Sequence, residues 1–436
     1  MGRFERLAKL GGLTTRVTSS YVGAKLKEAF VPEALREKAR EKLHVDNARE
    51  IVATMSRMKG AAMKLGQQLA LASSALDLPP EVTQLLGTLN ADGEPVPFDE
   101  VRASVERSLE APLSKLFRDF DPTPLGSASL GQAHVARLRD GTEVVVKVRH
   151  AGVEHSVETD LLALKAVLLS GRVLRRSRQE IDEVFDEIRA RLLEELDYLQ
   201  EAANIEAYQR AFADDPDIRV PRLYPALCTD CVLTMDRLPG RHLDAWLPTA
   251  TEEARQRAGA TLAELYYRQL FRLRMLHADP HIGNFLFEPD GRVGLVDFGC
   301  IKRFDPYFMS AYAEAALAAY EDDPARGKAA CARIGAWDGE TEADGEVVWQ
   351  FCRVLGHGFR QGVITLGDER EQLLEEVLPV MQQLVANPRV RLPKDVLFGH
   401  RALGGMYTLG RRIGTRTDFG AVLLRHVHVA IAAGQG

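Results

Sequence analysis

The feature that most constrains this chain is the spacing of three polar residues in two short segments of its second half. The segment His277-Ala-Asp-Pro-His-Ile-Gly-Asn284 is followed by Gly294-Leu-Val-Asp-Phe-Gly299. Asp279 and Asn284 are five positions apart, and Asp297 follows Asn284 by thirteen. A bare Asp-Phe-Gly tripeptide is mostly an ordinary turn, but chance agreement of all these spacings is rare. The combination is typical of a kinase-type nucleotide site.

These residue types suit the transfer of a phosphoryl group. The reaction needs one carboxylate near the attacking oxygen, and an Asn and a second carboxylate that hold Mg²⁺ against the triphosphate. Asp279 fits the first role as the catalytic residue, and Asn284 and Asp297 fit the second as metal ligands. His277 is expected to anchor the loop by hydrogen bonds rather than to act as an acid or base. We therefore expect ATP and Mg²⁺ as cofactors.

Composition places the chain among globular proteins that do not bind nucleic acid. Its 436 residues are 46% hydrophobic, which allows large cores and two or three structural units. The net charge of −6 argues against a nucleic-acid protein, which would need a basic surface. No apolar run reaches the roughly 18 to 20 residues of a membrane-spanning helix. We expect a cytoplasmic protein, either free or held peripherally at the inner face of a membrane.

The first 30 residues are amphipathic, with apolar and basic side chains interleaved. Two interpretations remain open: a helix that lies on an anionic membrane surface, or a helix that packs on its own domain. The residues concerned are Phe4, Leu7, Leu10 and Leu13, beside Arg3, Arg6 and Lys9.

Three segments of different character follow one another along the chain. Residues 1–115 are expected to form a helical extension, residues 116–236 a small lobe with a sheet, and residues 237–436 a mostly helical lobe. Strands and helices are thus partly segregated, which is typical of an α+β fold.

Local patterns predict individual elements. Apolar side chains from about 45 to 72 make one helical stripe, and a long helix is expected from about 179 to 210. Asp140-Gly141 is a hairpin turn signal between two alternating segments. A strand pair is expected around Phe285 and Leu295.

Lys147 lies on the second strand of the predicted hairpin. It is either a solvent-facing lysine on an edge strand or a cation that reaches the α and β phosphates. Its order in the chain, before Asp279 and Asp297, favours the phosphate role. The small-residue loop before the hairpin could bring backbone N–H groups close to phosphates, although small residues are also common in turns. The expected nucleotide-binding loop residues are Gly126, Ser127, Ala128 and Ser129.

Further motifs extend the pattern to both ends of the chain: Lys64-Leu-Gly-Gln67, Glu195-Leu-Asp197 and Arg401-Ala-Leu-Gly-Gly405. With Lys147 and the segments described above, they resemble the UbiB/aarF family of atypical protein-kinase-like ATP-binding proteins, also called the ADCK family. The resemblance covers nearly the whole chain and is nearest to the coenzyme Q kinase-like branch. It implies a bilobal protein-kinase-like fold with an N-terminal helical extension and a mostly helical C-lobe.

The resemblance implies that the extension folds over the site and carries Lys64 and Gln67 toward the nucleotide. Without it, Lys64 would be interpreted as a lysine that extends from a helix edge into water. A buried lysine needs a paired carboxylate, and Glu195 or Asp197 is the partner that the family pattern implies. These four residues are therefore expected to act as lid and regulatory residues.

Glu195 and Glu201 are six positions apart, or roughly 240° around one helix, so both cannot face Lys147. We assign Glu201 to Lys147, as part of the nucleotide-binding set, and Glu195 to Lys64. Met235, on an apolar strand, completes the expected nucleotide-binding set.

The chain also departs from typical protein kinases. Ala278 stands where they have the Arg that reads a phosphorylated activation loop, and no Ala-Pro-Glu anchor follows Asp297. Control by phosphorylation of such a loop is therefore not expected. His281 replaces the usual lysine two positions past the catalytic Asp, which removes a fixed charge from the γ-phosphate. Members of the resembled family often have Ala where Gly126 stands.

Three functions are weighed. The leading one is a kinase-like enzyme or ATPase that supports isoprenoid-quinone or lipid metabolism, as the resemblance implies. The second is a nucleotide-gated scaffold for a membrane-bound biosynthetic complex, and the third is a conventional Ser/Thr kinase. Expected partners are ATP, a membrane surface, a quinone precursor or lipid, and quinone-biosynthesis proteins. The intact Asp279 favours chemistry over pure binding.

Overall fold

The computed structural model describes most of the chain as two compact units. The first unit comprises residues up to 202 together with 223–237, and the second comprises 203–222 and 238–436. Residues 203–222 thus belong to the second unit, although the sequence grouped them with the sheet. The described residues are 11–13, 15–17, 19–20, 24, 33–58, 61–71, 76, 78, 80–87, 95–170, 178–279, 281–368, 373–387, 389–390 and 392–434.

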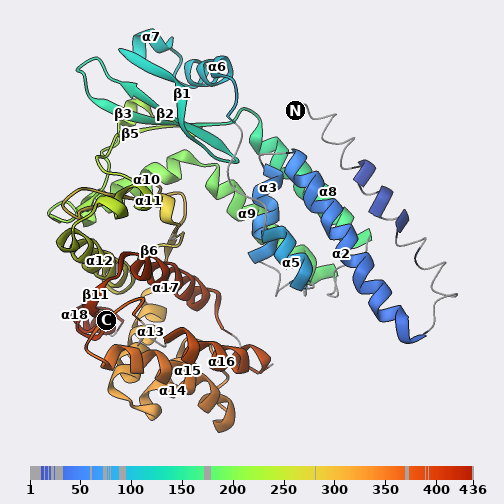
Figure 1. The fold of residues 1–436 in the computed structure, drawn as a ribbon, viewed down its shortest axis with the longest axis vertical. Helices are drawn as coiled ribbons and strands as arrows, with labels where there is room; N and C mark the ends of the chain where they lie inside the picture. Colours follow the sequence, from blue (N-terminus) through green and yellow to red (C-terminus); the bar gives the residue numbers. More distant parts are fainter. Residues whose placement is uncertain are drawn as a thin grey trace. The chain divides into compact units, whose positions relative to one another are not determined.

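The first unit contains a group of helices around one apolar core (Figure 1). The helix that the sequence predicts from 45 to 72 is described as two helices, with residues 59–60 outside the described part. The helices of this group are α2 (Glu33–Met58), α3 (Ala61–Leu71), α5 (Pro80–Gly87), α8 (Val153–Ser170) and α9 (Arg178–Glu195).

The amphipathic N-terminal segment is described only in part. Leu13 is fully buried in the core of these helices, which supports packing on its own domain for this residue. Phe4, Leu7 and Leu10 lie outside the described residues. The alternative of a membrane surface stays a prediction.

A four-stranded antiparallel sheet also belongs to the first unit. Val144, Val146 and Val148 share a core with α6 (Phe98–Ser108) and α7 (Leu113–Leu116), so the alternate side chain of Lys147 lies on the opposite face. The hairpin at Asp140-Gly141 is confirmed, and Gly141 has a φ of +95° that glycine adopts without strain. The strand order is β1 (Asp119–Ser127), β2 (Gly131–Arg137), β3 (Glu143–Arg149) and β5 (Val232–Asp236).

The prediction of one long helix from 179 to 210 is wrong. The chain breaks after α9, and a separate helix, α10 (Tyr198–Ala211), begins with Asp197 as its cap. Oδ1 of Asp197 accepts hydrogen bonds from the backbone N–H groups of the second and third residues of α10, at 3.0 and 3.2 Å. A short polar side chain that satisfies these donors favours a new helix start over continuation.

The described residues of the second unit form three small sheets. The strand pair expected around Phe285 and Leu295 is confirmed, since these residues pair across two antiparallel strands. The first sheet has the order β4 (Ile218–Arg219), β8 (Val293–Leu295) and β7 (Phe285–Phe287); β6 (Met275–His277) pairs with β9 (Ile301–Arg303), and β10 (Val363–Thr365) pairs with β11 (Arg416–Asp418).

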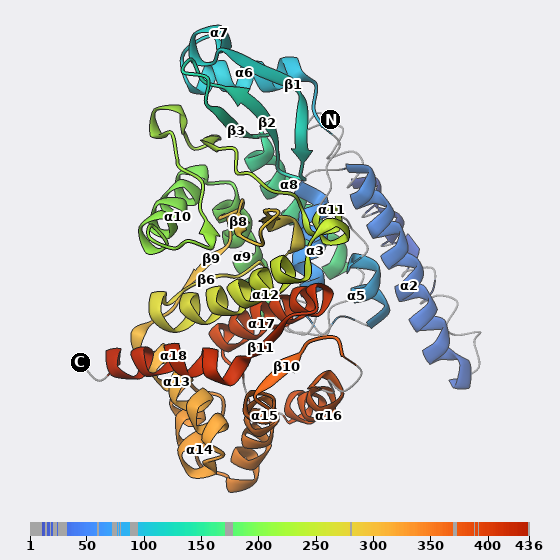
Figure 2. The ribbon, with the colours of Figure 1, turned by 60° about the vertical axis from the view of Figure 1, so that its left-hand side comes forward.

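Helices make up most of the second unit (Figure 2). α12 and α17 lie side by side in both views, and α13, α14, α15 and α16 gather together at one end. No helix among the residues described here is both long and apolar enough to cross a membrane. The helices are α11 (Leu243–Trp246), α12 (Glu252–Tyr267), α13 (Pro306–Glu321), α14 (Pro324–Arg333), α15 (Glu342–Arg360), α16 (Leu373–Ala386), α17 (Lys394–Ile413) and α18 (Phe419–Ala433).

Shorter helical turns complete both units. The π-helical turn directly continues α12, and Arg274 ends it in the left-handed region with a φ of +49°. Such π turns and left-handed non-glycine residues are concentrated near functional sites. The turns are η1 (Pro225–Leu227), η2 (Leu247–Thr249), η3 (Arg268–Leu273) and η4 (Ile282–Asn284).

Candidate functional site

The hairpin of β7 and β8 brings Asn284 and Asp297 together in the second unit. Asn284 directly precedes β7, and Asp297 follows the end of β8 by two positions. The backbone carbonyl of Asn284 accepts a hydrogen bond from the N–H of Val296 at 3.1 Å. Residues that flank an antiparallel pair at the same end are neighbours, which explains why a spacing of thirteen places these two side by side.

Asp279 joins this pair through the amide of Asn284. Nδ2 of Asn284 donates to the backbone carbonyl of Asp279 at 3.0 Å and to its Oδ2 at 3.2 Å. With the amide nitrogen turned to Asp279, the amide oxygen, which is the atom that could ligate a metal, points the other way. The structure thus brings together the three residues with which the sequence analysis began.

His277 anchors the loop, as expected from the sequence. Its Nε2 donates to the backbone carbonyl of Asp297 at 2.7 Å. The next residue, Ala278, is fully buried, and its N–H donates to the carbonyl of Cys300 at 2.9 Å. Oδ1 of Asp297 accepts a hydrogen bond from the N–H of Gly299 at 3.0 Å. Hydrogen bonds from residues 277 and 278 therefore join the two segments next to the carboxylates, and the side chain at position 278 is buried.

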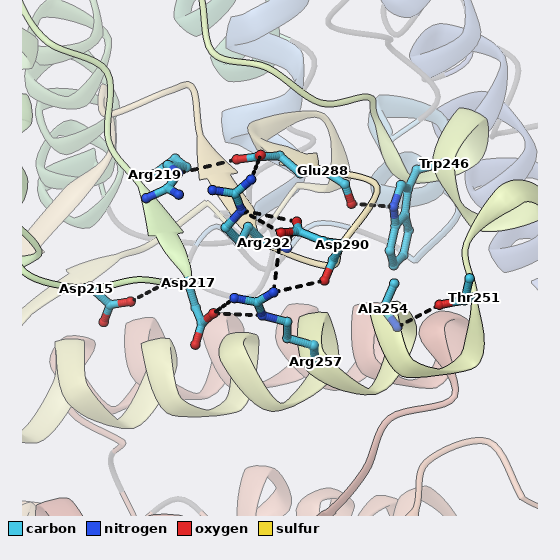
Figure 3. A network of polar contacts seen from close by, with 10 residues as sticks. All are labelled: Asp215, Asp217, Arg219, Trp246, Thr251, Ala254, Arg257, Glu288, Asp290 and Arg292. Atoms are coloured by element: carbon cyan, nitrogen blue, oxygen red, sulfur yellow. Dashed lines mark hydrogen bonds and ion pairs between the residues drawn. The ribbon is translucent and has the colours of Figure 1, made fainter.

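A network of charged side chains holds the far end of the β7–β8 hairpin (Figure 3). The buried carboxylate of Glu288 pairs with Arg219 of β4 at 3.4 Å and with Arg292 at 2.7 Å. Arg257 of α12 pairs with Asp290 in the hairpin turn at 3.4 Å. Because these contacts tie the turn to β4 and α12, they fix the direction of the two strands that carry the metal-ligand candidates.

Polar residues behind the loop were missed by the sequence analysis. Asn204 of α10 donates through Nδ2 to the carbonyl of Phe298 at 3.0 Å. Oε1 of Gln269, in η3, accepts from the buried hydroxyl of Tyr208 at 3.0 Å and from the N–H of His277 at 2.7 Å. No motif marks these residues, because each contributes to the site only after distant helices have packed.

Arg401 of α17 also reaches the loop. Its Nη2 lies 3.7 Å from Oδ1 of Asp279, and the two side chains are 39% and 41% exposed. The sequence indicated Arg401 only as part of a C-terminal motif without a role. Its place beside Asp279 depends on the packing of α17 against α12 and β6, for which the sequence carries no local signal.

In the first unit, Lys147 forms an ion pair with Glu201. Nζ of Lys147 lies 2.6 Å from Oε1 of Glu201, and the side chains are 16% and 6% exposed. The predicted pairing is confirmed. The edge-strand interpretation of Lys147 is wrong, because β2 and β5 flank β3 on either side.

The second predicted ion pair, between α3 and α9, is also confirmed. Nζ of Lys64 lies 2.9 Å from Oε2 of Glu195. The sequence reached these assignments from a wrong premise, since Glu195 and Glu201 belong to different helices and not to two faces of one. Gln67 lies in α3, but its side chain is outside the described part of the chain, and Asp197 caps α10.

Of the four expected loop residues, Gly126 and Ser127 lie at the end of β1, paired with Ala133 and Gln132 of β2, and Ala128 and Ser129 follow in the turn that leads to β2. The N–H of Ala128 donates to the carbonyl of Gly131 at 2.8 Å, and the side chain of Ser129 is buried. A Cβ at Gly126 would meet no atom within 4 Å, so an alanine would fit here. Met235 is buried in β5. A contact of these residues with a nucleotide stays a prediction.

The donor atoms at the loop suit a magnesium ion that arrives with a nucleotide. Within the described part of the chain, no group of three or more His, Cys, Asp or Glu side chains could hold a metal ion. Mg²⁺ in nucleotide sites usually keeps several waters and takes one or two carboxylates together with substrate phosphates. The amide oxygen of Asn284 and the carboxylate of Asp297 are hard oxygen donors of this kind.

Comparison with protein families confirms the kinase-like α+β fold. A family model described as an ABC1 atypical kinase-like domain matches residues 88–330. A solved structure, Rv3197 with erythromycin from Mycobacterium tuberculosis, is similar over 89% of this chain and 97% of its own, with a TM-score of 0.61 and 23% identity. At this identity, the structure shows a likeness of fold.

Proteins named as mitochondrial atypical kinases align with most of this chain. The one from Caenorhabditis elegans, coq-8, is 27% identical over 96% of this chain and 55% of its own length. COQ8B from Rattus norvegicus is 28% identical over 94% of this chain and 78% of its own. COQ8 from Saccharomyces cerevisiae is 27% identical over 84% of this chain and 74% of its own.

Proposed function

Because this chain belongs to the family of ABC1 atypical kinase-like domains, we propose that it binds Mg-ATP and either hydrolyses it or transfers its γ-phosphate. The observation that carries the proposal is the cluster of Asp279, Asn284 and Asp297 at one end of the β7–β8 hairpin. These residue types are those that phosphoryl transfer requires.

Each polar residue then has a distinct role. Asn284 and Asp297 would hold Mg²⁺, which neutralises charge on the phosphates. Asp279 would orient the acceptor hydroxyl, or a water, and accept its proton. Lys147, oriented by its buried partner Glu201, would bind the α and β phosphates as a point charge. The four residues from Gly126 to Ser129, at the end of β1 and in the turn after it, would complete the nucleotide contacts together with Met235.

For the acceptor of the phosphoryl group, we propose a class of molecule. The resemblance to coenzyme Q kinase-like proteins, together with relatives named as atypical kinases, supports a phenolic quinone precursor or a lipid as acceptor or activating ligand. Such ligands reside in membranes, so we propose that the protein acts peripherally at a membrane surface, together with proteins of quinone biosynthesis. Lys64 and Glu195, with Gln67 and Asp197, would regulate access to the site.

A nucleotide-gated scaffold is the alternative function. It would use the same Mg-ATP site with little turnover, and the intact Asp279 favours chemistry. A Ser/Thr protein kinase has the least support, because the fully buried Ala278 replaces the Arg that reads a phosphorylated activation loop.

The experiment is to measure phosphate release from Mg-ATP by the full chain, with and without liposomes and phenolic quinone precursors. Asp279→Asn should keep nucleotide binding and lower turnover at least about 100-fold, the usual contribution of a positioned acid or base. Asp297→Asn should weaken binding of the magnesium complex.

Asp322→Asn is a matched control, because Asp322 is exposed at the end of α13 in a left-handed conformation that Asn also adopts. Turnover that is unchanged in Asp279→Asn and Asp297→Asn would sink the enzymatic proposal. Nucleotide binding without turnover under any condition would favour the scaffold.

A further inference from the structure

Arg401 is held beside the loop by a helix that is anchored along its length. Asp395, in the first turn of α17, pairs with Lys302 of β9 at 2.7 Å. The carbonyl of Gly399 accepts a hydrogen bond from the buried hydroxyl of Tyr266 at 3.0 Å, and Ala402 is 1% exposed. Because these residues of α17 are held against the rest of the unit, Arg401 extends from the exposed face of the helix toward Asp279.

The loop itself offers little positive charge next to Asp279. Nδ1 of His281 accepts a hydrogen bond from the N–H of Gly283 at 3.1 Å, so this ring is engaged with the backbone of its own loop. His277 faces the backbone of Asp297. Arg401 of α17 is the guanidinium that pairs with the Asp279 carboxylate, so this fixed cation comes from outside the loop.

The contact between Arg401 and Asp279 is weak enough to be exchanged. At 3.7 Å, with both side chains about two-fifths exposed, it belongs to the class of solvated ion pairs that contribute little stability. A phosphate carries more charge than one carboxylate, and the planar guanidinium matches its oxygens with several N–H donors. A terminal phosphate placed near Asp279 would therefore compete well for Arg401.

We propose that Arg401 is a phosphate-binding residue that contacts the γ-phosphate of the bound nucleotide and discriminates a triphosphate from a diphosphate. The proposal rests on the proposed function, because it assumes that Asp279 lies beside the transferred group. Arg401 then provides a fixed cation beside a loop that has His281 in place of the usual lysine, and it stabilises negative charge on the transferred group. In the nucleotide-free chain Arg401 pairs with Asp279 instead.

The test compares nucleotide affinities of the full chain with Arg401→Gln, Arg401→Lys and the control Arg412→Gln. Arg412 lies on the same helix and pairs with the exposed Asp244. In Arg401→Gln, affinity for a non-hydrolysable Mg-ATP analogue should fall at least about tenfold, as for a lost charge-assisted hydrogen bond, while Mg-ADP affinity stays within about twofold. Arg401→Lys should recover part of the analogue affinity, because it keeps the charge but loses the planar fork.

Phosphate release provides a second readout. It should fall at least about 100-fold in Arg401→Gln, which is the lower end expected for an arginine that stabilises a transferring phosphoryl group. A midpoint of thermal unfolding close to that of Arg412→Gln would show that the variant is folded.

Three results would overturn the proposal. Equal losses of ADP and analogue affinity would indicate a structural role for Arg401, and unchanged affinities and turnover would indicate no role. If the unsubstituted chain binds neither nucleotide, the proposed function fails and the proposal falls with it. If the unsubstituted chain binds and hydrolyses ATP, but the Arg401 variants have the same nucleotide affinities and the same phosphate release, only the proposal for Arg401 is wrong and the proposed function stands.

Discussion

The buried ion pair of Lys147 and Glu201 matters for stability as well as for a nucleotide. The carboxylate of Glu201 is 6% exposed, so water hardly reaches it. A buried ion pair contributes little more to the free energy of unfolding than a well-packed apolar pair would. Removal of one partner is nevertheless costly, because it leaves a buried charge without this compensation. By contrast, Arg189 and Glu158 of the same unit are each more than two-fifths exposed.

Lys147→Met should therefore lower the free energy of unfolding by about 3 kcal/mol without any nucleotide, because the buried carboxylate of Glu201 loses this positive charge. Denaturant unfolding measures this value. The matched control Arg189→Met should change it by less than about 0.5 kcal/mol, as for other exposed pairs. The double variant Lys147→Met/Glu201→Leu should recover most of the loss, and a double variant as unstable as the single one would contradict this account.

At the scale of helices, the distance from a glycine to the backbone of a neighbouring helix decides whether alanine can replace that glycine. Gly356 of α15 faces the backbone of α13, and a Cβ there would lie 2.0 Å from the carbonyl oxygen of Ala319. A backbone atom cannot give way as a flexible side chain can. Gly404, in the middle of α17, has no atom within 4 Å of its Cβ position.

Gly356→Ala should lower the free energy of unfolding by at least about 2 kcal/mol, because the added methyl group forces α13 and α15 apart. Gly404→Ala should raise it by up to about 1 kcal/mol, since alanine is the better helix former. Chemical denaturation of both variants checks the pair. Equal effects would mean that helix propensity alone determines the result.

For the whole molecule, each unit has an apolar core of its own. The candidate phosphate-binding lysine is in the first unit, and the candidate metal ligands are in the second. A nucleotide that binds the native state and not the unfolded chain adds its binding free energy to the stability of the native state.

Mg-ATP at about one hundred times its Kd should therefore stabilise the chain by about 2.7 kcal/mol, measured as a rise in the thermal unfolding midpoint. Lys147→Met in the first unit and Asp297→Asn in the second should each remove most of this rise. If either variant kept the full rise, the substituted residue would have no part in binding the nucleotide.

Local chemistry explains what could be predicted without a structure. A Gly at the hairpin turn, an alternating strand and a short loop between strand ends all act through neighbouring residues, so the β2–β3 hairpin and the pair Asn284 and Asp297 were found from spacing alone. The prediction of one helix from 179 to 210 was wrong for a reason that is also local. Asp197 starts a new helix by capping it, a signal hidden within an apolar periodicity that continues on both sides.

The sequence by itself determined the kinase-like residue set, because each motif carries its chemistry in a few adjacent positions. Only the tertiary structure decided which residues surround that set. Arg401 reaches Asp279, and Asn204 reaches Phe298, through helices that pack from distant parts of the chain. Such contacts depend on the burial of whole helix faces. Apolar periodicity predicts which face of a helix is buried, but it does not predict which other element packs against that face.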